Sequence, residues 1–381
     1  MAGAVRGRAA SARDVAARVD EVRRRPDAAR ELAAMLAEQS PLFAGRGTNE
    51  AERLTGYVLA SFETAGLPPE AVPYVLEELE LGRNPYTVAA AARALRGARE
   101  VPAEAPALLV AAIARLRGAD DVVWFDGFAP APARGHATTA LAELARTLAQ
   151  LGPRAKPALG DLRALIDGEG EAFSPAVSAE LSSAAEALER ADAAVRLAPC
   201  CEQAAAPHVA GPTAGTELAD LALEDQDGTR LSASEAFAGR PTALAFFYTR
   251  CQNPEKCSLT VTRLGRLARL SNAEALEANV AGITYDPAFD RPARLKTYGA
   301  DRGVDFSPRC RLLRTIGPFD PVREAFDLGV GFGPVTVNRH RLDLVVLDDS
   351  LGVAARFRRR LWHEATVLDA LRAAAALAAG R

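Results

Sequence analysis

The 381-residue sequence has few cysteines, no long apolar run and little net charge, and each shortage excludes a class of protein. Five cysteines in a chain of this length are too few for a scaffold held together by disulfides. No stretch of about eighteen apolar residues occurs, and residues 1–14 lack the apolar core of a signal peptide. A net charge of −3, from 46 basic and 49 acidic residues, gives no electrostatic reason to bind nucleic acid or an anionic membrane. We therefore expect a cytoplasmic protein without a membrane segment, in which cysteines serve redox or metal chemistry.

Apolar material is plentiful by contrast. Hydrophobic residues make up 49% of the chain and charged residues 25%, which is enough for two ordinary domains. The hydrophobic pattern changes near the middle of the chain, where a stretch rich in Ala, Pro and Gly is typical of a linker. We predict a helical domain over residues 1–197, a linker over 198–216 and an α/β domain over 217–381.

The first of these regions shows amphipathic helical periodicity almost throughout. A proline followed by aliphatic residues recurs at Pro73, Pro106 and Pro157, and proline is tolerated in a first helical turn because its missing N–H has no intrahelical partner there. The pattern resembles HEAT repeats, in which stacked helix pairs bury each other's apolar faces. The resemblance implies a platform that binds a client protein, and an irregular helical bundle is the alternative.

The last region alternates short apolar runs with helical segments, and residues 225–228 form a hairpin signal. This alternation indicates a small mixed sheet of about the size of a thioredoxin fold, so the predicted fold class is α followed by α/β. Strands are predicted at 218–224, 243–248, 280–284, 342–347 and 353–357, and helices at 258–270, 291–299 and 362–379.

Two cysteines, Cys251 and Cys257, follow the apolar run 243–248, where a buried strand should end and a helix should begin at Ser258. Two thiols on one short loop could share a metal ion or close a disulfide. The amino terminus of the helix would lower the pKa of the nearby thiols and favour the thiolate as ligand and as nucleophile. Cys251 and Cys257 are therefore the predicted redox pair.

Four segments occur in an order that resembles the Sco/SenC family, thioredoxin-like copper proteins that help to load copper into cytochrome c oxidase. The resemblance spans roughly residues 217–381 and rests on segments 227–228, 246–257, 284–298 and 338–341.

In that family, two cysteines and one distant histidine bind copper, which implies Cys251, Cys257 and His340 as metal ligands here. Two thiolates and an imidazole form a soft site that accepts Cu(I), and also Cu(II) where the geometry allows. Asp286 resembles an acidic residue near the metal in the family, and capping of a turn is its alternative role.

The sequence departs from the family pattern in three respects. Five residues separate the cysteines where the family usually has three. Members of the family are normally membrane-anchored outside the cytoplasm, whereas no anchor or signal is seen in this sequence. Arg339 and Arg341 flank His340, and positive charges there would disfavour a metal cation.

Two other functions remain open. The domain could be a thiol-dependent peroxidase or disulfide reductase, or a non-catalytic scaffold with a degenerate thioredoxin-like domain. A metallochaperone or thiol-disulfide redox protein is favoured over a conventional enzyme. Cys310 has no partner at a telling spacing and is predicted to be a spectator, while Cys200 and Cys201 with His208 resemble a partial metal site without a rigid frame.

Overall fold

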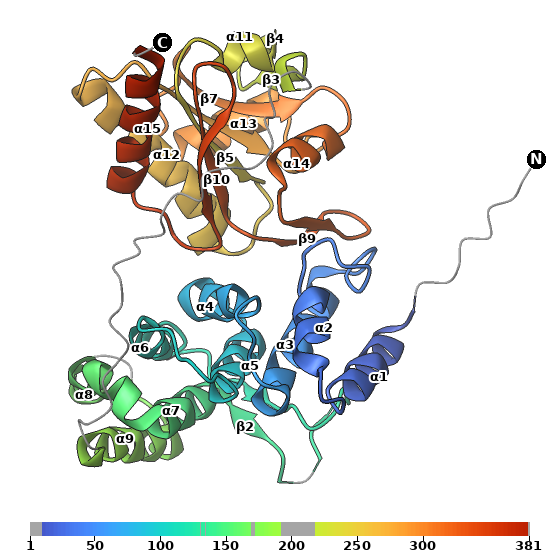
Figure 1. Ribbon diagram of the computed structural model, residues 1–381, viewed down its shortest axis with the longest axis vertical. Coiled ribbons are helices and arrows are strands. Elements are labelled where there is room, and N and C mark those ends of the chain that lie inside the picture. Colours follow the sequence, from blue (N-terminus) through green and yellow to red (C-terminus); the bar gives the residue numbers. More distant parts are fainter. Residues whose placement is uncertain (1–9, 130, 134, 169–171, 192–217, 380–381) are drawn as a thin grey trace, which may run out of the picture. The chain divides into compact units, whose positions relative to one another are not determined.

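The computed structural model describes residues 10–129, 131–133, 135–168, 172–191 and 218–379. The chain divides into two compact units, Met1–Cys201 and Glu202–Arg381, which Figure 1 draws and which are described separately here. The predicted linker, 198–216, lies outside the described residues, together with its two cysteines and its histidine.

The first unit is almost entirely helical in its described part. Neighbouring helices pack in series, α3 against α5, α5 against α7 and α7 against α9. The helices are α1 (Ala12–Val22), α2 (Ala28–Met35), α3 (Thr48–Ala65), α4 (Val72–Leu81), α5 (Pro85–Arg96), α6 (Ala105–Arg115), α7 (Ala140–Leu151), α8 (Leu159–Asp167), α9 (Pro175–Arg190) and the 3-10 helix η1 (Gly152–Ala158), with a small ribbon of β1 (Val122–Val123) and β2 (Thr138–Thr139).

Proline marks the start of several of these helices, as predicted. Pro73 and Pro106 lie in the first turns of α4 and α6, and Pro85 begins α5 behind Asn84, whose side chain accepts a hydrogen bond from the Tyr86 amide at 3.0 Å. Pro157 differs, because it lies inside η1 and the regular helix begins two residues later. The helical character is confirmed, and the likeness to HEAT repeats stays a prediction.

The second unit contains, within the described residues, a seven-stranded mixed sheet in the order β11-β10-β5-β6-β7-β3-β4. β5, β6 and β7 run parallel, and the remaining pairs in this sheet are antiparallel. The predicted α and α/β fold class is confirmed. The strands are β3 (Ala222–Asp225), β4 (Arg230–Ser232), β5 (Thr242–Phe247), β6 (Asn279–Thr284), β7 (Cys310–Thr315), β10 (Asp343–Leu347) and β11 (Val353–Arg358), with β8 (Val330–Phe332) and β9 (Val337–His340) forming a separate hairpin.

The centre of the sheet is apolar on both faces. All six residues of β5 and all six of β6 are buried, which is the pattern of parallel strands covered by helices on both sides. Helix α12 (Leu259–Ala273) packs against β5, β6 and α15 (Glu364–Ala379), whereas α13 (Pro292–Ala300) packs against β7 and β3. Two shorter helices, α11 (Ala233–Phe237) and α14 (Asp320–Phe326), complete the unit.

Strand β7 and the β8–β9 hairpin were not among the predicted strands. In β7, Arg311 and Arg314 interrupt the apolar run that marks a buried strand. Their guanidinium groups instead pair with carboxylates of β3, Arg311 with Asp225 at 3.8 Å and Arg314 with Glu224. Charge pairing across the two strands therefore lets a sequence with charged residues occupy the sheet interior.

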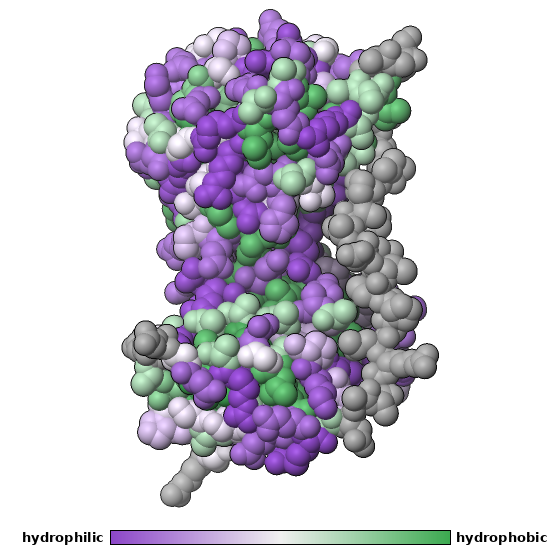
Figure 2. Space-filling view, turned by 90° about the vertical axis from the view of Figure 1, so that its left-hand side faces the viewer, coloured by the Kyte–Doolittle hydropathy of each residue, from purple (hydrophilic) through white to green (hydrophobic). Residues whose placement is uncertain are grey.

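Among the described residues, no helix combines the length and apolarity that crossing a membrane requires. The face of the protein in Figure 2 mixes hydrophilic and hydrophobic residues on both units. The strongly exposed large apolar side chains, Val122, Val335 and Leu377, lie far apart in the sequence.

Candidate metal and thiol site

The two cysteines lie where strand β5 gives way to helix α12. Cys251 follows the strand in a short loop, and Cys257 lies in a π-helical turn, η2 (Pro254–Ser258), that leads directly into α12. The side chain of Asn253 caps this turn by accepting a hydrogen bond from the Glu255 amide at 2.9 Å. A π turn holds more residues than an α turn, and with five residues between the cysteines both sulfurs still lie within 4.8 Å of each other. The unusual spacing therefore does not separate the thiols.

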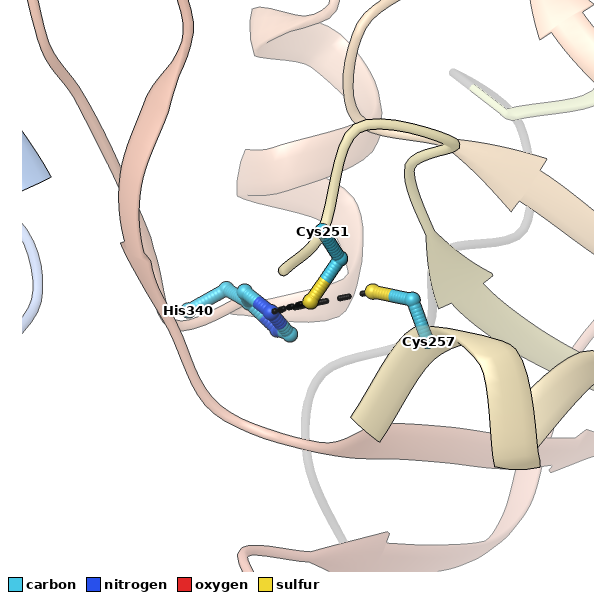
Figure 3. A group of neighbouring side chains, drawn as sticks. All are labelled: Cys251, Cys257 and His340. Atoms are coloured by element: carbon cyan, nitrogen blue, oxygen red, sulfur yellow. Dashed lines mark hydrogen bonds between the residues drawn. The ribbon is translucent and has the colours of Figure 1, made fainter. Parts of the chain in front are cut away.

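His340, the last residue of β9, completes the cluster. Its Nε2 atom lies 3.4 Å from Cys251 Sγ and 3.6 Å from Cys257 Sγ, and Figure 3 shows both thiols directed at this nitrogen. The other ring nitrogen, Nδ1, lies 3.2 Å from the carbonyl oxygen of Arg341, to which it donates its hydrogen. This bond orients the ring and leaves Nε2 as the atom that faces the sulfurs.

The structure thus brings together all three residues that the sequence proposed as metal ligands. One donor atom from each lies within 4.8 Å of the other two, and this is the one such group of histidine, cysteine and acidic side chains in the described part of the chain. Cys257 and His340 are buried, while Cys251 is partly exposed. The rings of Tyr248 and Tyr285 contact the imidazole, with centroids 5.4 and 5.6 Å from it.

The two thiols differ in acidity. A hydrogen bond from the Cys257 thiol, aided by nearby His340, holds the pKa of Cys251 well below the usual thiol value despite its burial. Burial and the neighbouring Cys251 thiolate raise the pKa of Cys257. The expectation that the helix terminus lowers the pKa of both thiols is therefore wrong for Cys257, because complete burial outweighs the helix dipole. Cys251 therefore gives up its proton more readily than Cys257.

The sequence suggested that Arg339 and Arg341 would disfavour a cation at His340, but their side chains are not directed at the cluster. Arg341 Nε lies 2.9 Å from both carboxylate oxygens of buried Asp343, so its charge is neutralised away from the cluster. Arg339 lies next to His340 on the same strand, and successive strand side chains point to opposite faces.

Asp286 does not join the cluster. Its carboxylate accepts hydrogen bonds from Arg250 at 3.1 Å (Nε) and 2.5 Å (Nη2), and its carbonyl accepts from the amides of Phe289 and Asp290. The Asp286 carboxylate thus forms an ion pair with Arg250, and the turn is closed by its backbone carbonyl rather than by its side chain.

Asp290 is a supporting residue that the sequence reasoning missed. It is fully buried, accepts a hydrogen bond from the Thr249 amide at 3.0 Å, and also accepts from the hydroxyls of Thr249 and Thr284. Burial raises the pKa of this carboxyl group. Asp290 therefore joins the loop that carries the cysteines, here called the cysteine loop, to the end of β6. The residue stands in the segment 284–298, but no sequence signal connected it to Thr249.

Cys310 lies apart from the cluster, in β7. It is buried in the sheet, and burial raises the pKa of its thiol to about 12. A thiol that stays protonated at neutral pH is a poor nucleophile and metal ligand. Its role as a spectator stays a prediction, which this environment supports.

Comparisons with known proteins agree with the resemblance in the sequence. The model of the SCO1/SenC family matches residues 212–312. No curated protein matches the chain.

Solved structures similar to part of the chain include two bacterial proteins and one yeast protein. A putative electron transfer protein of Aquifex aeolicus VF5 is 20% identical, with 43% of this chain and 94% of that one covered and a TM-score of 0.37. A SCO1/SenC family lipoprotein of Bacillus anthracis is 19% identical, with coverages of 42% and 96% and a TM-score of 0.37. Yeast Sco1, solved with copper bound, is 26% identical, with coverages of 42% and 90% and a TM-score of 0.31. Residues 212–312 thus match the SCO1/SenC family, and this stretch includes Cys251 and Cys257 but ends before His340.

Proposed function

We propose that the second unit is a copper-binding and thiol-redox protein of the Sco type, with Cys251, Cys257 and His340 as its ligands. The observation that carries this proposal is the convergence of two sulfurs and one imidazole nitrogen within 4.8 Å of one another. The hydrogen bond from Nδ1 to the Arg341 carbonyl supports it, because metal-binding histidines generally donate their second nitrogen in this way.

The donor set suits copper in both oxidation states. Two thiolates favour Cu(I), and the imidazole adds a ligand that Cu(II) prefers. The proton that Cys257 holds in the metal-free protein must leave when this sulfur becomes a ligand, so we expect copper affinity to rise with pH.

The same thiols support disulfide exchange with a partner protein. The Cys251 thiolate would attack a partner's disulfide, forming a mixed disulfide and releasing one partner thiolate. Cys257, after losing its proton to solvent or to that thiolate, would then attack Cys251 Sγ and release the second partner sulfur. The products are a 251–257 disulfide and a reduced partner.

The alternative of a thiol peroxidase or disulfide reductase draws support from the lowered pKa of Cys251 alone. A peroxidase also needs a cationic group directed at its thiolate. The neighbouring arginine, Arg250, instead contacts Asp286 and the carbonyl of Val335. We therefore favour metal binding and thiol exchange over peroxide reduction.

The first unit would bind the client protein, as its resemblance to helical repeats in the sequence implies. The packing of α3, α5, α7 and α9 in series supports a helical platform of this kind. The domain bounds 1–197 and 217–381 and the cytoplasmic location stay predictions.

Copper titration of wild type and His340→Ala tests the proposal. We expect the substitution to weaken Cu(II) binding about 10- to 100-fold and to weaken the thiolate-to-copper absorption band, while the 251–257 disulfide still forms. His363→Ala is the matched control, because this exposed histidine lies outside the cluster. A wild type that binds no copper in competition with a chelator, or that matches His340→Ala, would refute the copper assignment.

A further inference from the structure

The residue immediately before each cysteine reaches across to the hairpin that carries His340. Arg250 Nη2 donates to the carbonyl of Val335, in the turn of the β8–β9 hairpin, at 3.0 Å. Lys256 Nζ donates to the backbone carbonyl of His340 itself at 3.1 Å. Both side chains therefore connect the cysteine loop to the element that supplies the third ligand.

The hairpin lies outside the main sheet, and Val330 and Val337 anchor it in the apolar core. β8 and β9 pair only with each other among the described strands. Its base is attached to β10, where Asp343 accepts hydrogen bonds from the Gly329 amide and from Arg341. Its tip lacks apolar packing, since Val335 is 78% exposed.

Arg250 is itself held firmly. Its guanidinium group forms an ion pair with Asp286 and lies over the ring of Phe289, with Cζ 4.1 Å from the ring centroid. A planar guanidinium held on one side by a carboxylate and on a face by an aromatic ring keeps its remaining donors in a set direction. The Val335 carbonyl lies in that direction.

We propose that Arg250 and Lys256 are positioning residues that clamp the β8–β9 hairpin onto the cysteine loop and so hold His340 Nε2 within reach of both sulfurs. The inference rests on the proposed function for its metal-binding consequence. The clamp joins the hairpin at two points, its turn and its last residue, from the two ends of the loop that carries the thiols.

Hydrogen exchange of the reduced, metal-free full-length protein tests the clamp without copper. Arg250→Ala and Lys256→Met should each speed exchange of the amides in residues 330–340 relative to wild type. Arg294→Ala is the matched control for Arg250, because Arg294 also lies over the Phe289 ring, at 4.3 Å, and no hydrogen bond joins it to the hairpin in the described structure. Lys296→Met, which removes a lysine paired with Asp227, is the control for Lys256. Unchanged exchange of the hairpin in both clamp variants would overturn the proposal.

Copper binding then tests whether the clamp acts through His340. Arg250→Ala should weaken Cu(II) binding about tenfold in the wild-type background and have no further effect in His340→Ala. An equal loss in both backgrounds would show that Arg250 acts by another route and would overturn the proposal. Arg250→Lys keeps the positive charge but loses the planar, forked guanidinium group, so its loss of copper affinity should lie between wild type and Arg250→Ala. This variant provides the test if Arg250→Ala fails to fold. If wild type binds no copper, the proposed function fails, and hydrogen exchange alone decides the clamp.

Discussion

Both units bury a cluster of ionisable side chains, and the two clusters differ in whether their charges cancel. In the helical unit, Glu143 of α7 is 1% exposed and pairs with Arg96 and Arg93 of α5. In the α/β unit, Cys251, Cys257 and His340 converge with no carboxylate in their group, within the described residues. The first cluster joins helices, and the second leaves donor atoms facing one another.

The comparison shows how a buried polar cluster reveals its role. Arg96 also pairs with Glu63 of α3, so ion pairs across three helices balance the charges of this cluster. In the second cluster, two sulfurs and one imidazole nitrogen direct lone pairs at one another. A single proton can bind only one of these atoms, whereas a metal ion can bind all three. A cluster whose charges are paired therefore indicates stability, and a convergent set of soft donors indicates binding.

The largest expected effect tests the charge-paired cluster of the helical unit. Glu143→Ala should lower the free energy of unfolding by about 3 kcal/mol, because it leaves the partly buried Arg96 with Glu63 as its remaining ion-pair partner. Urea denaturation followed by far-UV circular dichroism, with hydrogen exchange of α5 and α7, measures the loss. Glu180→Ala is the control, since Glu180 pairs with Arg146 at the surface and should cost less than about 1 kcal/mol. Equal losses in the two variants would remove the contrast between the two clusters.

The reactivity of the thiols tests the cluster of the α/β unit. At pH 7 iodoacetamide should modify Cys251 more than about a hundredfold faster than Cys310, because the thiolate is the nucleophile and burial raises the pKa of Cys310 to about 12. Cys257→Ala should shift the pH profile of Cys251 alkylation upward, since it removes the hydrogen bond that lowers the Cys251 pKa. Mass spectrometry of the alkylated peptides provides both measurements. Equal rates for Cys251 and Cys310 would contradict the assignment of the thiolate.

Asp343 provides a buried carboxyl group in the α/β unit to compare with Glu143. Burial raises the pKa of Asp343 to about 6, so the folded protein binds a proton there more tightly than the unfolded chain. Its contribution to the free energy of unfolding is therefore full below about pH 4 and is lost as the pH rises through about 6, by about 2–3 kcal/mol.

Asp343→Asn should remove this part of the pH dependence. Urea midpoints of both proteins between pH 4 and pH 7 measure the difference in slope. Identical slopes would mean that the Asp343 carboxyl group titrates alike in the folded and unfolded chains.

The smallest effects compare one helical glycine from each unit. A Cβ at Gly160 in α8 would meet no atom within 4 Å, so Gly160→Ala should raise the free energy of unfolding by about 0.5–1 kcal/mol. A Cβ at Gly265 in α12 would lie 2.6 Å from the Gly303 carbonyl oxygen, so Gly265→Ala should lower it by about 1–3 kcal/mol. Thermal denaturation compares the two, and a stabilising Gly265→Ala would show that α12 packs less closely than described.

The site could be predicted in part, because some of its features are local. A buried apolar strand followed by two cysteines and a helix marks the ends of β5 and α12 without knowledge of the rest of the chain. His340 entered only through the family resemblance, since nothing near it in the sequence distinguishes it from a packing histidine. Asp290 was missed for a related reason, because its partner Thr249 lies 41 residues away.

The sequence by itself determined the periodic and local features of this protein. Helical periodicity, prolines in first turns and fully apolar runs depend on residues within one or two turns of each other, so α5 and β5 follow from their own residues. Only the tertiary structure decided which polar groups meet. Cys251 and His340 are 89 residues apart, and their contact depends on a hairpin that was not predicted. The opposite pKa shifts of Cys251 and Cys257 likewise arise from burial and from donors that lie close in space, which no local pattern of residues encodes.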